Sequence, residues 1–250
     1  MAERFFYPGP IDGALVHLSG EEMHHMIHVC RLGIGDRVIL FNGDGREYQA
    51  VIRNIRKREV ELAIESVAEV SRELPLHIHV AAPLPKADRA HFLVEKLTEL
   101  GVACYQPLLT SRSVIEPRPT RLEKLRRYVV EACKQCGRNR LMEIAPPVTF
   151  EQLLIYSRQV EGKLLADPEG KTLREVFCPG WSRVVVAIGP EGGFTTYELR
   201  QAHDQGWHMV SLGPTVLRIE TAALTMTAGL VLLCQQKFFP MALDSLDRFC

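Results

Sequence analysis

The sequence predicts an α/β protein in which a small, mostly β module precedes a larger domain built on a parallel sheet. Two observations predict this. Short segments of alternating apolar and polar residues, separated by tight-turn residues, fill the first 72 residues. Beyond Pro75, continuous apolar runs alternate with stretches of helical periodicity, which is typical of a parallel sheet covered on both faces. We therefore expect domains at residues 1–72 and 73–250.

The first module shows the signals of one short helix and a compact barrel. Ser19 and Glu22 have the spacing of a capping box, which predicts a helix running to about Arg31. Strand-like runs on both sides of the turn sequence Asn42–Gly45 predict a β-hairpin. Apolar residues alternate with glutamates over residues 59–65, as in a half-buried strand.

The second domain alternates strands and helices. Its expected strands are Ile78–Ala82, Tyr105–Leu109, Leu164–Ala166, Val184–Ile188 and Met209–Leu212. Its expected helices are Arg89–Leu100, Arg121–Cys136, Phe150–Tyr156, Tyr197–Gln205 and Thr221–Gln236. Thr195 and Glu198 predict another capping box, and Gly206 is placed to end that helix.

The bulk composition is that of an ordinary globular protein, with 46% hydrophobic and 24% charged residues. The longest apolar run, residues 222–234, is broken by two threonines and is too short to span a bilayer. The first residues lack the apolar core of a signal peptide. Seven cysteines without a framework spacing favour reduced thiols. We therefore expect a cytoplasmic protein with no membrane partner.

Two glycine–proline loops are the most informative feature of the chain. Gly189–Gly193 follows one apolar run, and the segment Leu212–Arg218 follows the next run and leads toward a helix. In open α/β sheets, ligands bind beyond the carboxyl ends of the strands. The two loops therefore predict one ligand site formed by neighbouring strand ends.

The composition of these loops argues against a phosphate ligand. No Gly-Lys-Ser/Thr sequence follows either loop, and the G-x-G-x-x-G spacing is absent. Glu191 places a carboxylate inside the first loop, where it would repel a polyphosphate. A ligand with cationic or hydrogen-bond-donor groups is favoured, and a nucleotide-dependent kinase or hydrolase is disfavoured.

Positive charge is concentrated in two segments although the chain as a whole is neutral, with 30 basic and 30 acidic residues. Residues 112–140 hold nine Arg or Lys and three Asp or Glu, and residues 31–58 hold seven and three. One such cluster in each domain favours a surface that binds RNA or DNA. A solvated helix face is the alternative for Arg121–Arg127.

The whole chain resembles a family of RNA methyltransferases. The Gly189–Gly193 loop and the segment Leu212–Arg218 resemble the SPOUT class, specifically its bacterial branch that methylates N3 of a uridine in 16S ribosomal RNA. Further matches lie, in the family's order, at Arg4–Phe6, His24–Leu32, Gly35–Asp36, Glu95–Val102, Ser111–Ser113 and Glu131–Arg138. The family commonly has an arginine where this chain has Thr215, a departure that bears on RNA affinity or substrate choice rather than on the fold.

The resemblance implies a PUA-like barrel followed by an α/β domain with a deep trefoil knot, a rare exception to unknotted folding. It also implies S-adenosylmethionine as the cofactor, 16S ribosomal RNA or the small ribosomal subunit as the partner, and a homodimer in which the partner subunit helps to complete each site. No metal is expected. Phe238 and Phe239 are candidates for covering a dimer face, with core burial as the alternative.

The implied cofactor makes the loop composition intelligible, because glycines let the backbone approach a ligand closely and apolar side chains can sandwich an adenine. The residues expected to hold S-adenosylmethionine are Leu165, Ala166, Ile188, Gly189, Pro190, Glu191, Gly192, Gly193, Leu212, Gly213, Leu217, Thr221 and Ala222. The residues expected to contact RNA are Arg4, Arg31, Arg112 and Arg138.

Methylation at N3 requires the loss of a proton from the uracil. Arg218 and Arg138 are candidates for stabilising the deprotonated base or anchoring phosphate, and Glu220 or Glu191 for orienting the base or accepting the proton. A structural pairing of Arg218 with Glu220 or a helix end is the alternative. For the chain as a whole, the alternative to an enzyme is a non-catalytic RNA-binding factor of ribosome assembly.

Two further spacings are weaker signals. His24 and His28 have the i, i+4 spacing of zinc ligands, but no third ligand is evident nearby, so core or surface histidines are favoured. Cys133 and Cys136 form a C-x-x-C pair without a second pair and within a predicted helix, which disfavours a thiol function.

Overall fold

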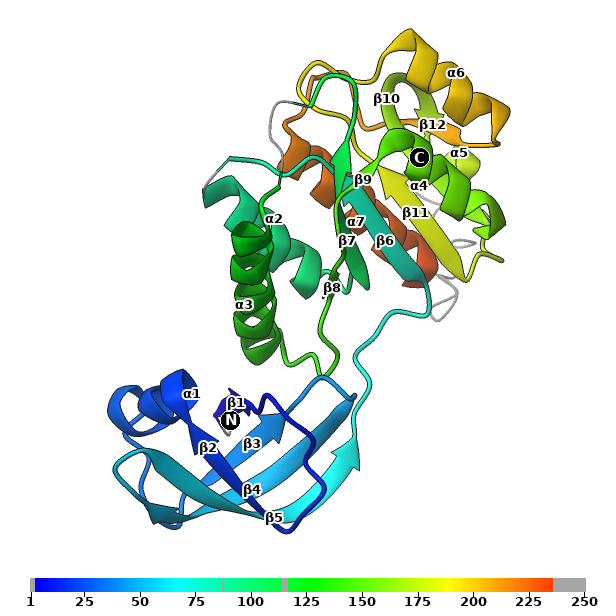
Figure 1. Ribbon diagram of the computed structural model, residues 1–250. Coiled ribbons are helices and arrows are strands. Elements are labelled where there is room, and N and C mark those ends of the chain that lie inside the picture. The colour runs from blue at the N-terminus through cyan, green and yellow to red at the C-terminus, as the bar shows by residue number, and fades with distance from the viewer. Residues whose placement is uncertain (1–2, 87, 114–116, 236–250) are drawn as a thin grey trace, which may run out of the picture. The chain divides into compact units, whose positions relative to one another are not determined.

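The structure is a computed structural model that describes residues 3–86, 88–113 and 117–235. The chain divides into two compact units (Figure 1). The first comprises Met1–Glu73 together with Arg127–Leu141, and the second comprises Leu74–Arg126 together with Met142–Cys250. Sequence periodicity did not indicate that residues 127–141 group with the first unit.

The first unit is built on a five-stranded mixed sheet that curls around its own core (Figure 1). Its strands, in chain order, are β1 (Arg4–Phe6), β2 (Leu15–Ser19), β3 (Arg37–Phe41), β4 (Arg46–Ile55) and β5 (Glu59–Glu69). They are arranged as β1-β3-β4-β5-β2, with β1 parallel to β3 and the other pairs antiparallel. The predicted hairpin around Asn42–Gly45 is confirmed by β3 and β4, and the predicted strand at residues 59–65 is confirmed by β5.

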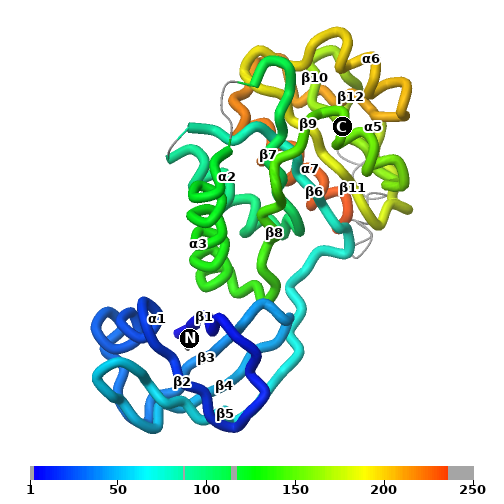
Figure 2. Tube along the Cα trace, in the orientation of Figure 1, coloured from blue at the N-terminus to red at the C-terminus, as the bar shows by residue number. Residues whose placement is uncertain are grey.

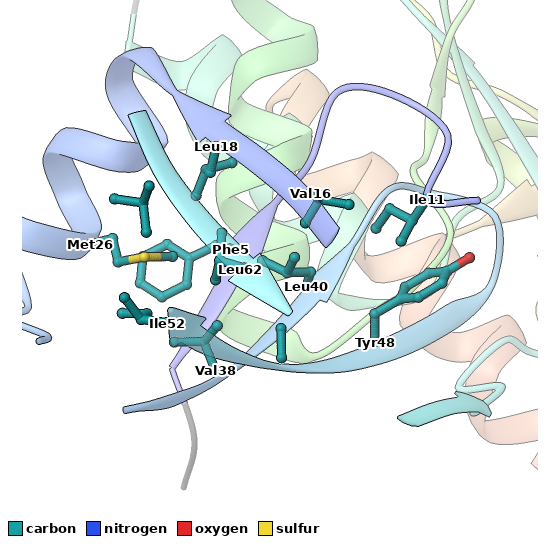
Figure 3. Packing of buried hydrophobic residues seen from close by; sticks show 12 residues of the cluster. Phe5, Ile11, Val16, Leu18, Met26, Val38, Leu40, Tyr48, Ile52 and Leu62 are labelled. Carbon is teal, nitrogen blue, oxygen red and sulfur yellow. The ribbon is translucent and has the colours of Figure 1, made fainter. Parts of the chain in front are cut away.

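Alternating side chains of these strands form the core of the first unit. Figure 3 shows Phe5, Met26, Ile52 and Leu62 gathered between the curled strands, and each is 0% exposed. Burying apolar side chains of this size stabilises a fold by about 1.5–3 kcal/mol each. Alternation with period two therefore decides which face of each strand turns inward.

The helix after β2 is present, but its predicted capping box is wrong. Helix α1 (Gly20–His24) continues into one π-helical turn (His25–Val29). Ser19 lies at the N-cap position without a side-chain hydrogen bond. The Glu22 carboxylate instead accepts from the Phe6 N–H at 3.0 Å and from Lys134 Nζ at 2.9 Å. In the bond from Lys134 both partners are charged, whereas a cap would offer Glu22 only a neutral backbone N–H.

A charged cluster ties residues 127–141 to the strands of the first unit. Glu47 Oε1 accepts from Arg4 Nη1 and Arg72 Nη1, each at 2.7 Å, and from Asn139 Nδ2 at 3.3 Å. Asn139 also donates to the Val70 carbonyl at 2.8 Å. Burial opposes ionisation of Glu47, but the bonds from its partners dominate and lower its pKa. The cluster joins four segments of the chain that lie far apart in sequence.

The second unit is a sheet in which every pairing is parallel, as predicted. Its strands are β6 (His77–Ala82), β7 (Cys104–Leu109), β8 (Glu143–Ile144), β9 (Val148–Thr149), β10 (Gly162–Thr172), β11 (Arg183–Ala187) and β12 (His208–Ser211). The order is β12-β10-β11-β6-β7-β8, and β9 pairs with β7. Figure 2 shows β11 and β6, far apart in sequence, running side by side.

Helices cover both faces of this sheet. They are α2 (Asp88–Glu99), α4 (Phe150–Tyr156), α5 (Leu173–Val176), α6 (Thr196–Asp204) and α7 (Ile219–Gln235), while α3 (Pro119–Cys136) belongs to the second unit only as far as Arg126 and to the first unit from Arg127 onward. Helices α4 and α6 pack against Val185 and Ala187 of β11. Val184 and Val186 point to the other face, and α7 packs against α2 and β6. The five expected helices are confirmed, with bounds that agree to within two residues. The expected end of the last helix, Gln236, lies outside the described residues. Helix α5 was not predicted. None of the described helices is long and apolar enough to cross a membrane.

Candidate active site

A cavity of about 330 Å³ in the second unit lies beyond the carboxyl ends of β11 and β12 and beside the middle of β10. Its lining residues are Ala166, Asp167, Pro168, Ile188, Gly189, Pro190, Glu191, Gly192, Gly193, Phe194, Val210, Leu212, Gly213, Thr215, Val216, Leu217 and Ala222. Both glycine–proline loops contribute to it. The cavity lies within the size range of small-molecule sites and at the strand ends where ligands of parallel sheets bind.

The structure brings most of the predicted cofactor residues together in this cavity. Leu165 and Thr221 are the exceptions among them, because neither lines it. Leu165 is 0% exposed and packs in the core beneath the site. Thr221 is exposed on the first turn of α7.

A break in strand β10 forms the first wall; the sequence predicted Ala166 there but not the break itself. Ala166 and Lys171 both align with Val210 of β12, so residues 167–170 bulge out of the ladder. Asp167 and Pro168 of this bulge line the cavity. Gly170 lies so close to β12 that an added Cβ would be 2.4 Å from the Met209 carbonyl carbon. The turn-forming residues at 167–170 were the available signal.

The Gly189–Gly193 loop forms the second wall. The Ile188 N–H donates to the Ala81 carbonyl at 2.9 Å, which fixes the start of the loop to strand β6. The Gly193 N–H donates to the Pro190 carbonyl at 2.8 Å and closes a tight turn. Gly193 has φ +67°, in the region that favours glycine. An added Cβ at Gly189 would be 3.1 Å from the Phe194 ring.

The third wall is the segment that leads from β12 into α7. Gly213 has φ +119°, a conformation that glycine adopts readily and other residues do not. Val216 is 87% exposed at the rim, and Thr215 also lines the cavity. The departure from the family's arginine at Thr215 thus falls on the wall of the site itself.

A buried carboxylate lies behind the second wall. The predicted capping box of α6 is confirmed, with Thr195 as N-cap and Glu198 as its partner. Glu198 is 1% exposed, and its Oε2 accepts from Thr195 N at 2.7 Å and Thr195 Oγ1 at 2.9 Å. Its Oε1 accepts from the Ser111 N–H at 2.9 Å. Burial alone would raise the pKa of Glu198, but these hydrogen bonds outweigh it and lower the pKa.

The predicted RNA-binding residue Arg112 contacts the second wall. Its Nη1 donates to the Gly192 carbonyl and, at 3.5 Å, to the Phe194 carbonyl. Its Cδ lies 3.3 Å from the position that a Cβ would occupy on Gly192. The arginine therefore spans from the loop after β7 to the loop after β11.

The predicted catalytic residues fall in different places. Arg218 is exposed where the third wall enters α7, and no hydrogen bond or ion pair of its guanidinium is recorded within the described part of the chain. Glu220 is 6% exposed. Its Oε1 lies 3.7 Å from Arg89 Nη1, while its Oε2 is buried without a hydrogen-bond partner among the described residues. The recorded ion pair of Glu220 is thus with Arg89 and not with Arg218.

Arg138 and Arg4 both lie in the first unit and are largely buried. Arg138 is 3% exposed and forms a two-pronged ion pair with Glu73, at 3.1 and 2.6 Å. The Arg4 side chain is 10% exposed, and its Nη2 donates to Asn139 Oδ1 at 2.6 Å. Little of either guanidinium is available to a phosphate in this arrangement.

Arg31 is exposed and has an unusual backbone. It follows the π-helical turn with φ +57°, the one positive φ at a residue other than glycine among the described residues. Left-handed backbone costs an L-residue about 1–2 kcal/mol. Such strained residues cluster at functional sites.

The two weaker signals in the sequence, the His24–His28 and Cys133–Cys136 pairs, do not belong to a metal-binding group among the described residues. The rings of His24 and His28 lie 4.8 Å apart. In the described residues, no group of three or more His, Cys, Asp or Glu is arranged to hold a metal ion. Cys133 is buried and its Sγ donates to the Arg140 carbonyl at 3.6 Å, and neither it nor Cys136 forms a disulfide within the described part of the chain. Phe238 and Phe239, the candidates for a dimer face, lie outside the described residues.

Comparison with known proteins agrees with the two-unit architecture. The family described as RNA methyltransferase domain matches residues 72–231, and the family described as RNA methyltransferase PUA domain matches residues 18–65. Two curated relatives are both named ribosomal RNA small subunit methyltransferase E. The protein from Bacillus subtilis is 30% identical over 83% of this chain and 86% of its own length. The protein from Synechocystis is 34% identical over 86% of this chain and 72% of its own length.

Solved structures show the same fold, a PUA-like barrel followed by a SPOUT methyltransferase domain. A methyltransferase from Legionella pneumophila in complex with S-adenosylmethionine is 36% identical, with a TM-score of 0.85 over 95% of this chain and 98% of that one. The ribosomal RNA small subunit methyltransferase E of Neisseria gonorrhoeae, bound to S-adenosylmethionine, is 28% identical, with a TM-score of 0.84 over 96% and 98%. The chain belongs to the ribosomal RNA small subunit methyltransferase E family.

Proposed function

We propose that this protein transfers a methyl group from S-adenosylmethionine to N3 of a uridine in 16S ribosomal RNA. The observation that carries the proposal is the cavity beside the break in β10 and the ends of β11 and β12, lined by both glycine–proline loops. Relatives of this family whose structures hold S-adenosylmethionine share the fold over nearly the whole chain. Membership of an RNA methyltransferase family supplies the class of substrate.

The residues of the cavity fit this cofactor. Ile188, Leu212 and Leu217 offer apolar contact to an adenine ring, and glycines on two walls let backbone groups approach it. The carboxylates of Asp167 and Glu191 belong to the lining and favour a cationic ligand over an anionic one. S-adenosylmethionine supplies the methyl group on a positively charged sulfonium.

The protein's part of the chemistry is to hold the uracil and to stabilise its deprotonated form. Arg218 is exposed at the start of α7, beside the third wall, where its guanidinium is available to the developing negative charge. Glu220, whose Oε2 is buried without a partner, and Glu191 are the candidates for accepting the N3 proton. The target base would have to leave its stack to reach the site. Arg138, the other arginine considered for anchoring phosphate, would first have to leave its buried ion pair with Glu73.

Two measurements test the proposal. Calorimetry with S-adenosylmethionine should detect binding, and methyl incorporation into undermethylated small-subunit RNA should detect transfer. We expect Arg218→Ala to lower turnover by at least a hundredfold, on the order of 2.7 kcal/mol or more, with cofactor and RNA binding retained. Arg200, exposed on α6 away from the cavity lining, gives a charge-matched control.

The outcomes separate the alternatives. Failure to incorporate methyl groups into RNA, whether or not the cofactor binds, would favour a non-catalytic RNA-binding factor of ribosome assembly over an enzyme. Wild-type turnover in the Arg218→Ala protein would remove the role given to that arginine. Mass-spectrometric mapping of ribosomal RNA from cells that lack the protein identifies the modified nucleotide, and a base other than uridine would overturn the N3 assignment.

We further propose that the protein acts as a homodimer through helix α7. Apart from Glu220, the helix carries no charged side chain. Its outer face presents Leu224, Ala228 and Leu232, the last of them 65% exposed. Two exposed threonines, Thr221 and Thr225, share this face, but a helix with no charge beyond its first turn is normally covered. Light scattering should show a dimer that Leu232→Glu converts to monomer, and a monomeric wild-type protein at micromolar concentration would refute it.

The remaining features inferred from the family follow the same proposal. We propose that residues 73–250 carry the catalytic domain, knotted as in SPOUT enzymes, and that residues 1–72, with the segment 127–141 that groups with them, carry RNA binding. Exposed Arg31 is the leading candidate there for a phosphate contact. Because the proposed substrate is ribosomal RNA, we also propose that the protein acts in the cytoplasm.

A further inference from the structure

We infer that Arg112 is a positioning residue for the cofactor: it holds the Gly189–Gly193 loop in the conformation that binds S-adenosylmethionine. Arg112 does not line the cavity, so its effect would pass through the loop. The inference rests on the proposed function, because it concerns the affinity for that cofactor. It replaces the expectation from the sequence that Arg112 is an RNA contact.

The tip of the loop has few other polar restraints. Its start is fixed by the Ile188 bond to β6, and Phe194 at its end is buried against Phe150, with ring centres 5.1 Å apart. Between them, Glu191 and Gly192 are exposed. The recorded backbone restraint inside the tip is the single turn bond from Gly193 N to the Pro190 carbonyl. One hydrogen bond within a turn leaves such a segment free to open locally.

Arg112 supplies the restraint that the tip lacks. One guanidinium nitrogen donates to two carbonyls of the loop, those of Gly192 and Phe194. The aliphatic part of the side chain packs on Gly192, with Cδ 3.3 Å from its Cβ position. A charged donor makes stronger bonds to carbonyls than a neutral one. Because Gly192 has no side chain, the arginine can pack at this distance without having to shift.

The base from which Arg112 reaches is itself rigid. The turn Thr110–Ser113 after β7 is closed by Ser113 N donating to the Thr110 carbonyl at 3.0 Å and Thr110 N donating to Ser113 Oγ at 2.9 Å. The neighbouring Ser111 N–H is bound by the buried carboxylate of Glu198. Glu198 also caps the helix that follows the cofactor loop. The Glu198 carboxylate therefore holds two segments at once: the turn that carries Arg112, through Ser111, and the start of α6, through Thr195.

The consequence is preorganisation of the site. If the binding-competent loop conformation is only a fraction of the population, the apparent dissociation constant rises by the inverse of that fraction. Loss of a charge-assisted hydrogen bond is worth roughly a tenfold change, about 1.4 kcal/mol. Removing Arg112 should thus weaken cofactor binding about tenfold or more without removing any group that lines the cavity.

The test measures binding of S-adenosylmethionine by calorimetry, with no RNA present, to wild type, Arg112→Ala, Arg112→Lys and Arg200→Ala. We expect the dissociation constant to rise at least tenfold in Arg112→Ala. Arg112→Lys should recover part of the loss, because its ammonium can still donate to the loop. Arg200→Ala should match wild type. Arg112 is exposed, so substitution should leave the fold intact, as a melting temperature will verify.

Kinetics distinguish this role from RNA binding. The expected pattern for Arg112→Ala is a raised KM for S-adenosylmethionine, with kcat at saturating cofactor and KM for RNA near wild type. An unchanged cofactor dissociation constant together with a raised KM for RNA would overturn the inference and restore the RNA contact. If wild type itself bound no S-adenosylmethionine, the proposed function would fail first, which is a separate result.

Discussion

Gly170 offers a sharp test of how the bulge in β10 builds the cavity. An added Cβ at this position would lie 2.4 Å from the Met209 carbonyl carbon and 2.5 Å from both the Met209 oxygen and the Val210 nitrogen. All three are backbone atoms of β12, so no side chain can rotate away to relieve the contact. Gly170→Ala must therefore push the bulge and β12 apart.

The size of the effect follows from that geometry. Ordinary contacts of a Cβ begin at about 3.4 Å, so the strands would have to separate by on the order of 1 Å. Overpacking of this kind costs about 1–3 kcal/mol. For a domain of this size, roughly 2 kcal/mol lowers Tm by about 4–8 °C. Asp167 and Pro168 belong to the same bulge and line the cavity, so they would shift with it. Affinity for S-adenosylmethionine should therefore fall at least tenfold as well.

Calorimetry and thermal unfolding on Gly170→Ala measure both effects. Gly180→Ala is the matched control, because the nearest atom to its added Cβ is Cys178 Sγ at 3.8 Å, an ordinary contact. We expect the control to stay within about 0.5 kcal/mol of wild type. A Gly170→Ala protein with wild-type Tm and wild-type cofactor affinity would refute the reasoning that the bulge is fixed by this close approach.

Two further predictions concern buried charge and backbone strain. Glu198→Gln should lower the free energy of unfolding at pH 7 by about 2–3 kcal/mol, because one amide cannot accept from both Ser111 and Thr195. The folded pKa of Glu198 is lowered, so its stabilisation is complete above the unfolded value of about 4.3 and is lost as pH falls through the folded pKa. Denaturation curves of the two proteins should thus converge in acid, and a gap that is independent of pH would contradict this. Arg31→Gly should leave stability unchanged or raise it by about 0.5 kcal/mol, since it relieves a positive φ. The same variant should weaken RNA binding and reduce its salt slope by about one phosphate contact, and an unchanged slope would remove Arg31 from the RNA surface.

The sequence predicted the elements of the second unit well because their signals are local. Continuous apolar runs and helical periodicity depend on neighbours within one element, as does the Thr195–Glu198 cap. Both loops of the cavity were predicted for the same reason, since each follows directly from a strand that ends in glycine and proline.

What escaped prediction depends on partners distant in sequence. Glu22 bonds to Lys134 instead of capping its own helix, and Glu220 pairs with Arg89. Arg112 lies 80 residues from the carbonyl it binds. The bulge in β10 exists only in register with β12. No pattern within a short window carries such pairings.

The charged cluster around Glu47 makes the first unit discontinuous in the order of synthesis. Glu47, Arg4 and Arg72 are made early, yet Asn139, which bonds both Arg4 and Glu47, emerges more than sixty residues after Arg72. A nascent barrel that ends near residue 73 leaves this buried carboxylate without its amide partner. The first unit can therefore complete its fold only after residues 74–126 of the second unit and then its own segment 127–141 have been translated. Cutting the chain at its apparent boundary would yield a fragment, not a free-standing domain.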